Sequence, residues 1–203
     1  KQYTLVYDLD LARLGAEIQY NVDRRSTVSG PFDRIAYFLE LQKAGESTKY
    51  VYVSMDAFTN DLSKIAVPTA ASKARFQQAV GKINVVSNVP GIVTGTALEG
   101  GNIEFWPNNY GPANTANVPN ASGDLWDFGD EMSAAPVDGY GSMQVHNHQA
   151  RQTLFAINQW KDAATADIGI GNSEGKTRDW TFTSNASQYE VKRLRVLVRT
   201  GAK

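Results

Sequence analysis

Strict alternation of apolar and polar residues is the feature of this sequence that most limits its fold. The clearest run spans residues 192–199, where apolar Leu194, Val196 and Val198 alternate with basic Arg193, Arg195 and Arg199. Successive side chains of a strand point to opposite faces, so this run predicts a strand with one core face and one solvated face. A strand so near the end of the chain also closes the fold into one cooperative unit.

Similar patterns recur almost throughout the chain. Predicted strands, rich in Val, Ile, Tyr, Phe or Trp, are 3–8, 16–22, 34–41, 49–58, 82–87, 102–106, 125–128, 142–148, 153–160, 167–171, 180–183 and 189–200. Residues 70–80 could form a short helix, although Phe76 and Val80 alone make a poor apolar stripe. Many short strands separated by turn residues predict an all-β jelly-roll or concanavalin-like sandwich of two antiparallel sheets. No linker-like composition divides the chain, so we expect residues 1–203 to form a single β-sandwich domain.

Charge and composition exclude several kinds of partner. The chain has 20 Lys and Arg against 21 Asp and Glu, interspersed without a basic block. We therefore expect it to bind neither nucleic acid nor an anionic membrane surface. No apolar run approaches the roughly 20 residues of a membrane-spanning helix. The absence of cysteine excludes disulfide bonds and thiolate chemistry.

Two of the alternating runs carry the side chains best suited to a binding site. The residues that should face away from the core are Asn102, Glu104 and Trp106 in one run and Gln144, His146 and His148 in the other. The two histidines are the only ones in the chain. If the two strands lie near each other, a carboxylate, amides, imidazoles and an indole form one binding surface.

This set of side chains permits three interpretations. His146 and His148 with Glu104 could hold a transition metal, because imidazole and carboxylate suit Zn, Cu or Fe. The histidines could instead serve as a catalytic base and a group that neutralises a carboxylate. They could also donate and accept hydrogen bonds to a glycan, which requires no special pKa, and we favour this last interpretation.

Aromatic residues near these runs also suit a sugar ligand, because a sugar's C–H face packs on an aromatic ring while amides and carboxylates bond its hydroxyls. Trp106 and Tyr110 lie in or beside an Asn-rich stretch, and Tyr50 and Tyr52 share a strand face with Ser54 and Asp56. The expected ligand is a polysaccharide or oligosaccharide.

An acidic stretch follows the Asn-rich one. Its hard oxygen donors are Asp124, Asp127, Asp130, Glu131 and Asp138. Carboxylates gathered in a loop suit Ca²⁺, which takes six to eight oxygen ligands in flexible geometry. Their spacing does not match an EF-hand, and turn formation by Asp and Gly explains the composition equally well. A structural calcium ion is therefore one of two interpretations.

Several runs resemble a domain found in secreted bacterial proteins that are named sialate O-acetylesterases or related polysaccharide-processing enzymes. The resemblance is carried by residues 31–41, 52–58, 101–110, 144–148 and 169–172 and by the Arg-rich last strand. It implies a secreted or periplasmic protein from a bacterium. The chain has no Gly-x-Ser-x-Gly nucleophile motif, so the resemblance implies an accessory glycan-binding module.

A second resemblance is confined to Gln144-Val145-His146, which is similar to the Gln-Ile/Val-His motif of jelly-roll alginate lyases. In those enzymes the glutamine and histidine contact the uronate. The other lyase motifs are missing. The resemblance implies His146 as a base, a tyrosine such as Tyr52 as the acid, and Arg34 or Arg195 against the uronate carboxylate.

The sequence thus leads to three hypotheses. In the leading one, the chain recognises a glycan with Trp106 and Tyr110 stacked on sugar rings and Asn102, Glu104, Gln144, His146 and His148 bonding hydroxyls. In the second, it is a carbohydrate-active enzyme, foremost an eliminative polysaccharide lyase that draws on His146, His148, Tyr52, Arg34 and Glu104. In the third, it is a structural or protein-interaction sandwich.

Overall fold

The protein is described by a computed structural model that covers residues 2–74, 76–106, 141–159, 162–171 and 184–201. At Gln77 and Trp106 only the backbone is described. The strands predicted at 125–128 and 180–183 lie outside these residues. The described part contains strands and short 3₁₀ helices, and no helix in it is long and apolar enough to cross a membrane.

The strands form two antiparallel sheets. The larger has seven strands in the order β2 (Val22–Asp23), β1 (Tyr3–Asp10), β12 (Tyr189–Thr200), β3 (Phe32–Lys43), β4 (Lys49–Asp56), β6 (Ile83–Ser87) and β7 (Gly95–Leu98). The smaller has five in the order β11 (Asp167–Ile170), β10 (Gln152–Gln159), β9 (Gly141–Asn147), β8 (Gly101–Trp106) and β5 (Phe76–Val80). The 3₁₀ helices are η1 (Leu11–Arg13), η2 (Leu62–Lys64), η4 (Ala163–Thr165) and η5 (Ala186–Gln188).

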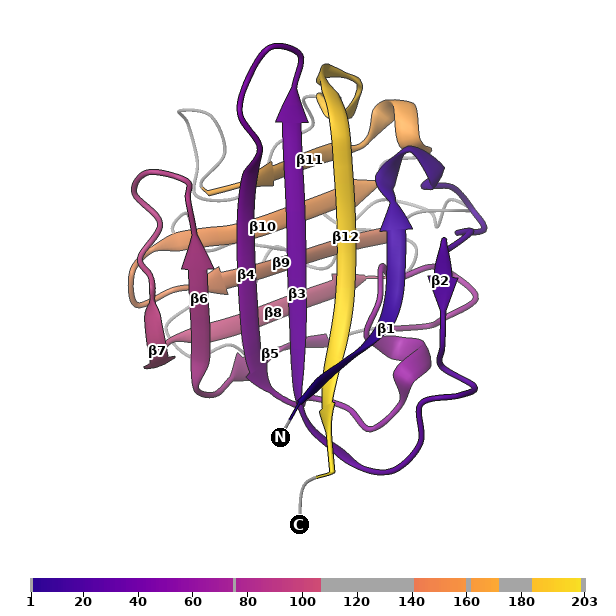
Figure 1. Ribbon diagram of the computed structural model, residues 1–203, viewed down its shortest axis with the longest axis vertical. Coiled ribbons are helices and arrows are strands. Elements are labelled where there is room, and N and C mark those ends of the chain that lie inside the picture. Colours follow the sequence, from indigo (N-terminus) through magenta and orange to yellow (C-terminus); the bar gives the residue numbers. More distant parts are fainter. Residues whose placement is uncertain (1, 75, 107–140, 160–161, 172–183, 202–203) are drawn as a thin grey trace.

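The two sheets stack face to face, and the strands of the smaller sheet run crosswise behind those of the larger (Figure 1). Tyr37 on β3 joins them, because its ring centroid lies 6.2 Å from that of Phe105 on β8 and 5.7 Å from that of Phe155 on β10. Its hydroxyl donates to the Ile65 carbonyl oxygen at 2.6 Å, which satisfies a polar group inside the core. The prediction of an all-β sandwich of two antiparallel sheets is confirmed.

The alternation predicted for the last strand is also confirmed. Leu194, Val196 and Val198 are 0% exposed and belong to the hydrophobic core that both sheets share. β12 pairs with β1 on one side and β3 on the other, so the end of the chain lies in the middle of the larger sheet. A single domain over residues 1–203 includes residues that are not described and stays a prediction.

Two local predictions are wrong. Residues 16–22 are not a strand, because only Val22–Asp23 pairs, as β2, with β1. Residues 70–80 are not a helix but a turn followed by β5. β5 pairs with β8 opposite Phe105, and the Phe76 and Phe105 rings pack at 6.1 Å. The apolar stripe of this segment was too weak to support a helix, and its contact with β8 stabilises a strand instead.

Candidate functional site

The two alternating runs singled out in the sequence are neighbouring strands. β8 and β9 pair so that Asn102 lies opposite His146 and Glu104 lies opposite Gln144. The alternate residues, including Ile103 and Val145, are 0% exposed and belong to the core. The expected direction of Asn102, Glu104, Gln144 and His146 is therefore confirmed, and the strand pairing meets the condition that the two runs lie near each other.

Neighbouring strands extend this set into a larger surface, which we call the polar face. It is the side of the five-stranded sheet turned away from the core, and it carries Asn102, Glu104, Ser142, Gln144, His146, Thr153, Asn158 and Asp167. None of these residues is more than 4% exposed. Asn102, Glu104, Gln144 and His146 thus turn away from the core without being exposed, since strand alternation sets direction but not solvent access. Their role as ligand-binding residues stays a prediction.

Hydrogen bonds join side chains across the polar face. The Asn158 Oδ1 atom accepts from Ser142 Oγ at 2.8 Å and from Gln144 Nε2 at 3.3 Å. At the end of β9, Asn102 Nδ2 lies 2.6 Å from His148 Nδ1. Which atom donates in this contact depends on the tautomer of His148. These contacts satisfy part of the hydrogen-bonding capacity of the buried amides.

Burial controls the charge of both histidines. It lowers the pKa of His146 well below its usual 6.5, and the nearby His148 lowers that pKa further. Burial also lowers the pKa of the half-buried His148. Both rings are therefore neutral at pH 7. Because its pKa is low and its ring is buried, His146 is a poor proton acceptor.

The residues invoked for a lyase are not brought together. Arg34 and Tyr52 lie on β3 and β4 with their side chains on the outer face of the seven-stranded sheet, and Arg195 on β12 shares that face. His146 lies on the outer face of the other sheet. Packed sheets are about 10 Å apart, so both sheets and the core separate this base from its expected partners.

Other predicted residues fall outside the described part of the chain. These are the side chain of Trp106 together with Tyr110, Asp124, Asp127, Asp130, Glu131 and Asp138. Calcium binding by the acidic stretch stays a prediction. Among the described residues no three His, Asp or Glu side chains converge as a metal site, so Glu104, His146 and His148 do not form the transition-metal site considered above.

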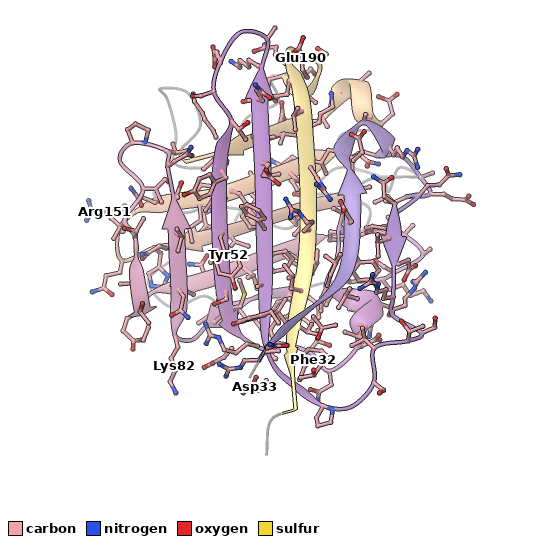
Figure 2. The ribbon with its side chains drawn as sticks, viewed as in Figure 1. Phe32, Asp33, Tyr52, Lys82, Arg151 and Glu190 are labelled. Carbon is pink, nitrogen blue, oxygen red and sulfur yellow. The ribbon has the colours of Figure 1, made fainter. Side chains whose placement is uncertain are left out.

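The outer face of the seven-stranded sheet carries a feature only half visible in the sequence, which we call the aromatic row: Tyr3, Phe38, Tyr50 and Tyr52. All four side chains are partly exposed. Ring centroids are 5.9 Å apart for Phe38 and Tyr50, 6.4 Å for Phe38 and Tyr52, and 6.4 Å for Tyr3 and Tyr52. Figure 2 shows Tyr52 beside β3 and β4 on the side of the sheet turned toward the viewer. Tyr50 and Tyr52 were recognised by alternation, but strand pairing was needed to add the others.

Four ion pairs surround the aromatic row. They join Arg34 to Asp56, Arg193 to Asp8, Arg195 to Glu40 and Arg199 to Asp33. The Arg195 guanidinium carbon also lies 4.7 Å from the centroid of the Phe38 ring, a cation–π contact. The hydrogen bond from Arg193 lowers the pKa of Asp8. Burial, with the neighbouring Tyr3, raises the pKa of Tyr52 to about 12, so its hydroxyl stays protonated at neutral pH.

Comparison with protein-family models, with curated proteins and with solved structures finds no match to this chain. The two resemblances drawn from sequence runs stay expectations.

Proposed function

We propose that the protein binds a neutral polysaccharide along the aromatic row of the seven-stranded sheet. The observation that carries the proposal is the row itself, in which four partly exposed rings from three strands contact one another edge to face. Edge-to-face packing sets neighbouring rings of the row at 64–85° to one another. A flat, open sheet face accommodates an extended chain better than a single small molecule.

The side chains beside the row supply the polar half of such recognition. Sugar rings offer apolar C–H faces to aromatic groups and hydroxyls that both donate and accept hydrogen bonds. Glu40 and Arg195 lie next to Phe38 and are 24% and 28% exposed, so they remain within reach of a ligand's hydroxyls. The hydroxyl of Tyr52, kept protonated, adds a group that can both donate and accept.

The charge balance of this face supports a neutral ligand. Each of its four arginines already pairs with a carboxylate, among them Arg34 with Asp56 and Arg195 with Glu40. A uronate carboxylate would have to compete with these carboxylates, and a polyanion would gain little from a face without surplus positive charge. This balance, with His146 on the other side of the molecule, gives the lyase hypothesis no geometric support.

Affinity electrophoresis and calorimetry against a panel of neutral glucans, mannans and xylans would test the proposal, with alginate and pectate as anionic polymers. The variants are Tyr50→Ala and Tyr52→Ala, with Tyr189→Ala as a control because Tyr189 lies at the start of β12 outside the row. Truncating a ring at the centre of a binding surface costs about 1–2 kcal/mol, so each row variant should bind roughly 5- to 30-fold more weakly.

Retention on a neutral polymer that Tyr52→Ala weakens and Tyr189→Ala preserves would support the proposal. Equal binding by all variants, or binding to alginate and pectate alone, would refute it. The same incubations monitored for unsaturated products test the alternative: product release that depends on His146 would make the chain a lyase.

A further inference from the structure

A concave site lies at the edge of the sandwich and shares no residue with the aromatic row. A cavity of about 360 Å³ opens beside β1, β2 and η2, and we call it the edge cavity. Its volume falls at the lower end of the range for small-molecule sites. Residues 16–20, the segment predicted as a strand, contribute to its wall through Ala16, Glu17, Ile18 and Tyr20.

Two tyrosine rings form an apolar wall of the edge cavity. The ring centroids of Tyr7 and Tyr20 lie 4.7 Å apart with the planes inclined by 43°. The Tyr7 hydroxyl donates to the Leu62 carbonyl oxygen at 2.6 Å, which fixes the first ring against η2. Burial raises the pKa of both hydroxyls, that of Tyr7 to about 12, so neither ring carries charge at neutral pH.

Other residues of the lining present both hydrogen-bond donors and acceptors. Arg25 uses one nitrogen on Asp23 at 2.9 Å, and a guanidinium has further N–H groups to offer. Ser63 Oγ gives its proton to Asp61 at 2.6 Å, so its oxygen is left to accept. Glu17 adds a carboxylate acceptor. Hydroxyls of a ligand would find partners of both kinds.

The charges around the edge cavity limit its ligand. Arg25 is balanced by Asp23, and Glu17 adds a negative charge to the lining. No surplus positive charge is available to an anion at this site, at least among the described residues. The Arg25 side chain, which is 53% exposed, would repel a cation. The lining therefore favours a neutral ligand.

We propose that the edge cavity is a second binding site that accepts a single neutral sugar ring, packed on Tyr20 and hydrogen-bonded by Arg25 and Glu17. The combination of an aromatic wall, mixed donors and acceptors, a lining without surplus positive charge among the described residues, and a small volume carries this inference. It does not depend on the aromatic row, since the two sites share no residue.

The test is a titration of the full chain monitored by ¹⁵N–¹H NMR. The ligands are the neutral sugars glucose, galactose, mannose and N-acetylglucosamine and, separately, the anionic glucuronate. Ala71→Phe fills the cavity from an exposed wall position, and Ala44→Phe is the matched control in the exposed β3–β4 turn. Tyr20→Phe keeps the ring and removes only its hydroxyl. We expect saturable shifts at Tyr20 and Val67 with one or more neutral sugars.

Ala71→Phe should abolish these shifts, whereas Ala44→Phe should preserve them. Tyr20→Phe should also preserve them, because the proposed contact uses the ring and not its hydroxyl. The absence of saturable shifts with every neutral sugar, survival of the shifts in Ala71→Phe, or binding of glucuronate alone would overturn the proposal. Tyr52→Ala distinguishes the sites: it should leave these titrations unchanged whether or not the aromatic row binds a polysaccharide.

Discussion

The two outward-turned faces of the sandwich follow the same alternating pattern and yet differ in their contact with water. On the seven-stranded sheet, residues such as Val86, 52% exposed, and Arg193 reach solvent. On the five-stranded sheet, Gln144 and His146 point away from the core and are 0% exposed. A side chain can therefore point away from the core without reaching solvent. Polar residues occupy such outward positions both where they are exposed and where they are buried.

The chemistry of each face matches its environment. The outer face of the seven-stranded sheet, called the open face below, holds ion pairs such as Arg195 with Glu40 and the rings of the aromatic row. These groups remain partly hydrated at little cost in free energy. The polar face holds amides and neutral imidazoles that bond one another, such as Gln144 with Asn158 and Asn102 with His148. Leaving a buried polar group without a hydrogen bond costs more than such a bond contributes, so these amides and imidazoles need partners on the face itself.

The largest expected effect comes from placing the same charge on each face. Gln144→Glu puts a second carboxylate opposite Glu104 among buried side chains and should lower the free energy of unfolding by at least about 3 kcal/mol. Val86→Glu places a carboxylate on the exposed outer face of the seven-stranded sheet and should change that free energy by less than about 0.5 kcal/mol. Urea unfolding of both variants measures the difference. Equal costs would mean that the polar face is accessible to water.

The pH dependence of stability should separate the two faces in the next largest effect. The pKa of folded His146 lies well below its unfolded value of 6.5, so its contribution is complete above pH 6.5 and is lost as pH falls below it. At about 1.4 kcal/mol per pH unit for one proton, roughly 2 kcal/mol should be lost between pH 6.5 and 5. Urea titrations across this range measure the slope.

His146→Gln is the control for that slope and should flatten it, leaving the smaller contribution of His148. On the open face the pKa of Asp8 is lowered from 3.8, so its contribution persists above that value and is lost only as pH falls below it. A slope between pH 6.5 and 5 that is unchanged in His146→Gln would contradict the burial of this ring.

A matched pair of asparagines provides the smallest contrast. Asn158→Ala leaves Ser142 Oγ and Gln144 Nε2 without their shared buried acceptor and should cost about 2 kcal/mol. Asn84 Oδ1 on the open face accepts a hydrogen bond from the Ala97 N–H at 2.8 Å. Water can accept that bond when the Asn84 side chain is removed. Asn84→Ala should therefore cost under about 1 kcal/mol by thermal or urea unfolding. The reverse order would mean that the polar-face network contributes little.

Much of the fold was predictable because strand alternation is a local property. The core-facing residues of β8, β9 and β12, such as Ile103, Val145 and Val196, followed from that alternation, whereas the pairing of β8 with β9 did not. Residues 16–22 and 70–80 were mispredicted because their local patterns are weak. In the first, most of the segment forms a cavity wall, and in the second, Phe76 is placed by its contact with Phe105 on another strand.

The candidate sites were less predictable than the fold. The direction of Gln144 and His146 was correct, but their burial depends on groups distant in the sequence. Tyr50 and Tyr52 were recognised as a pair, whereas Phe38 joins them only through the pairing of β3 with β4. The edge cavity had no sequence signal, because its walls come from separate segments.

By itself the sequence determined the fold class and which side chains of each strand leave the core, since both follow from a period of two along the backbone. The tertiary structure decided that His146 is sealed, that Arg34 and Tyr52 lie on the opposite side of the molecule, and that four aromatic rings meet. These properties depend on sheet stacking and strand order, which join residues far apart in the chain and so leave no local pattern.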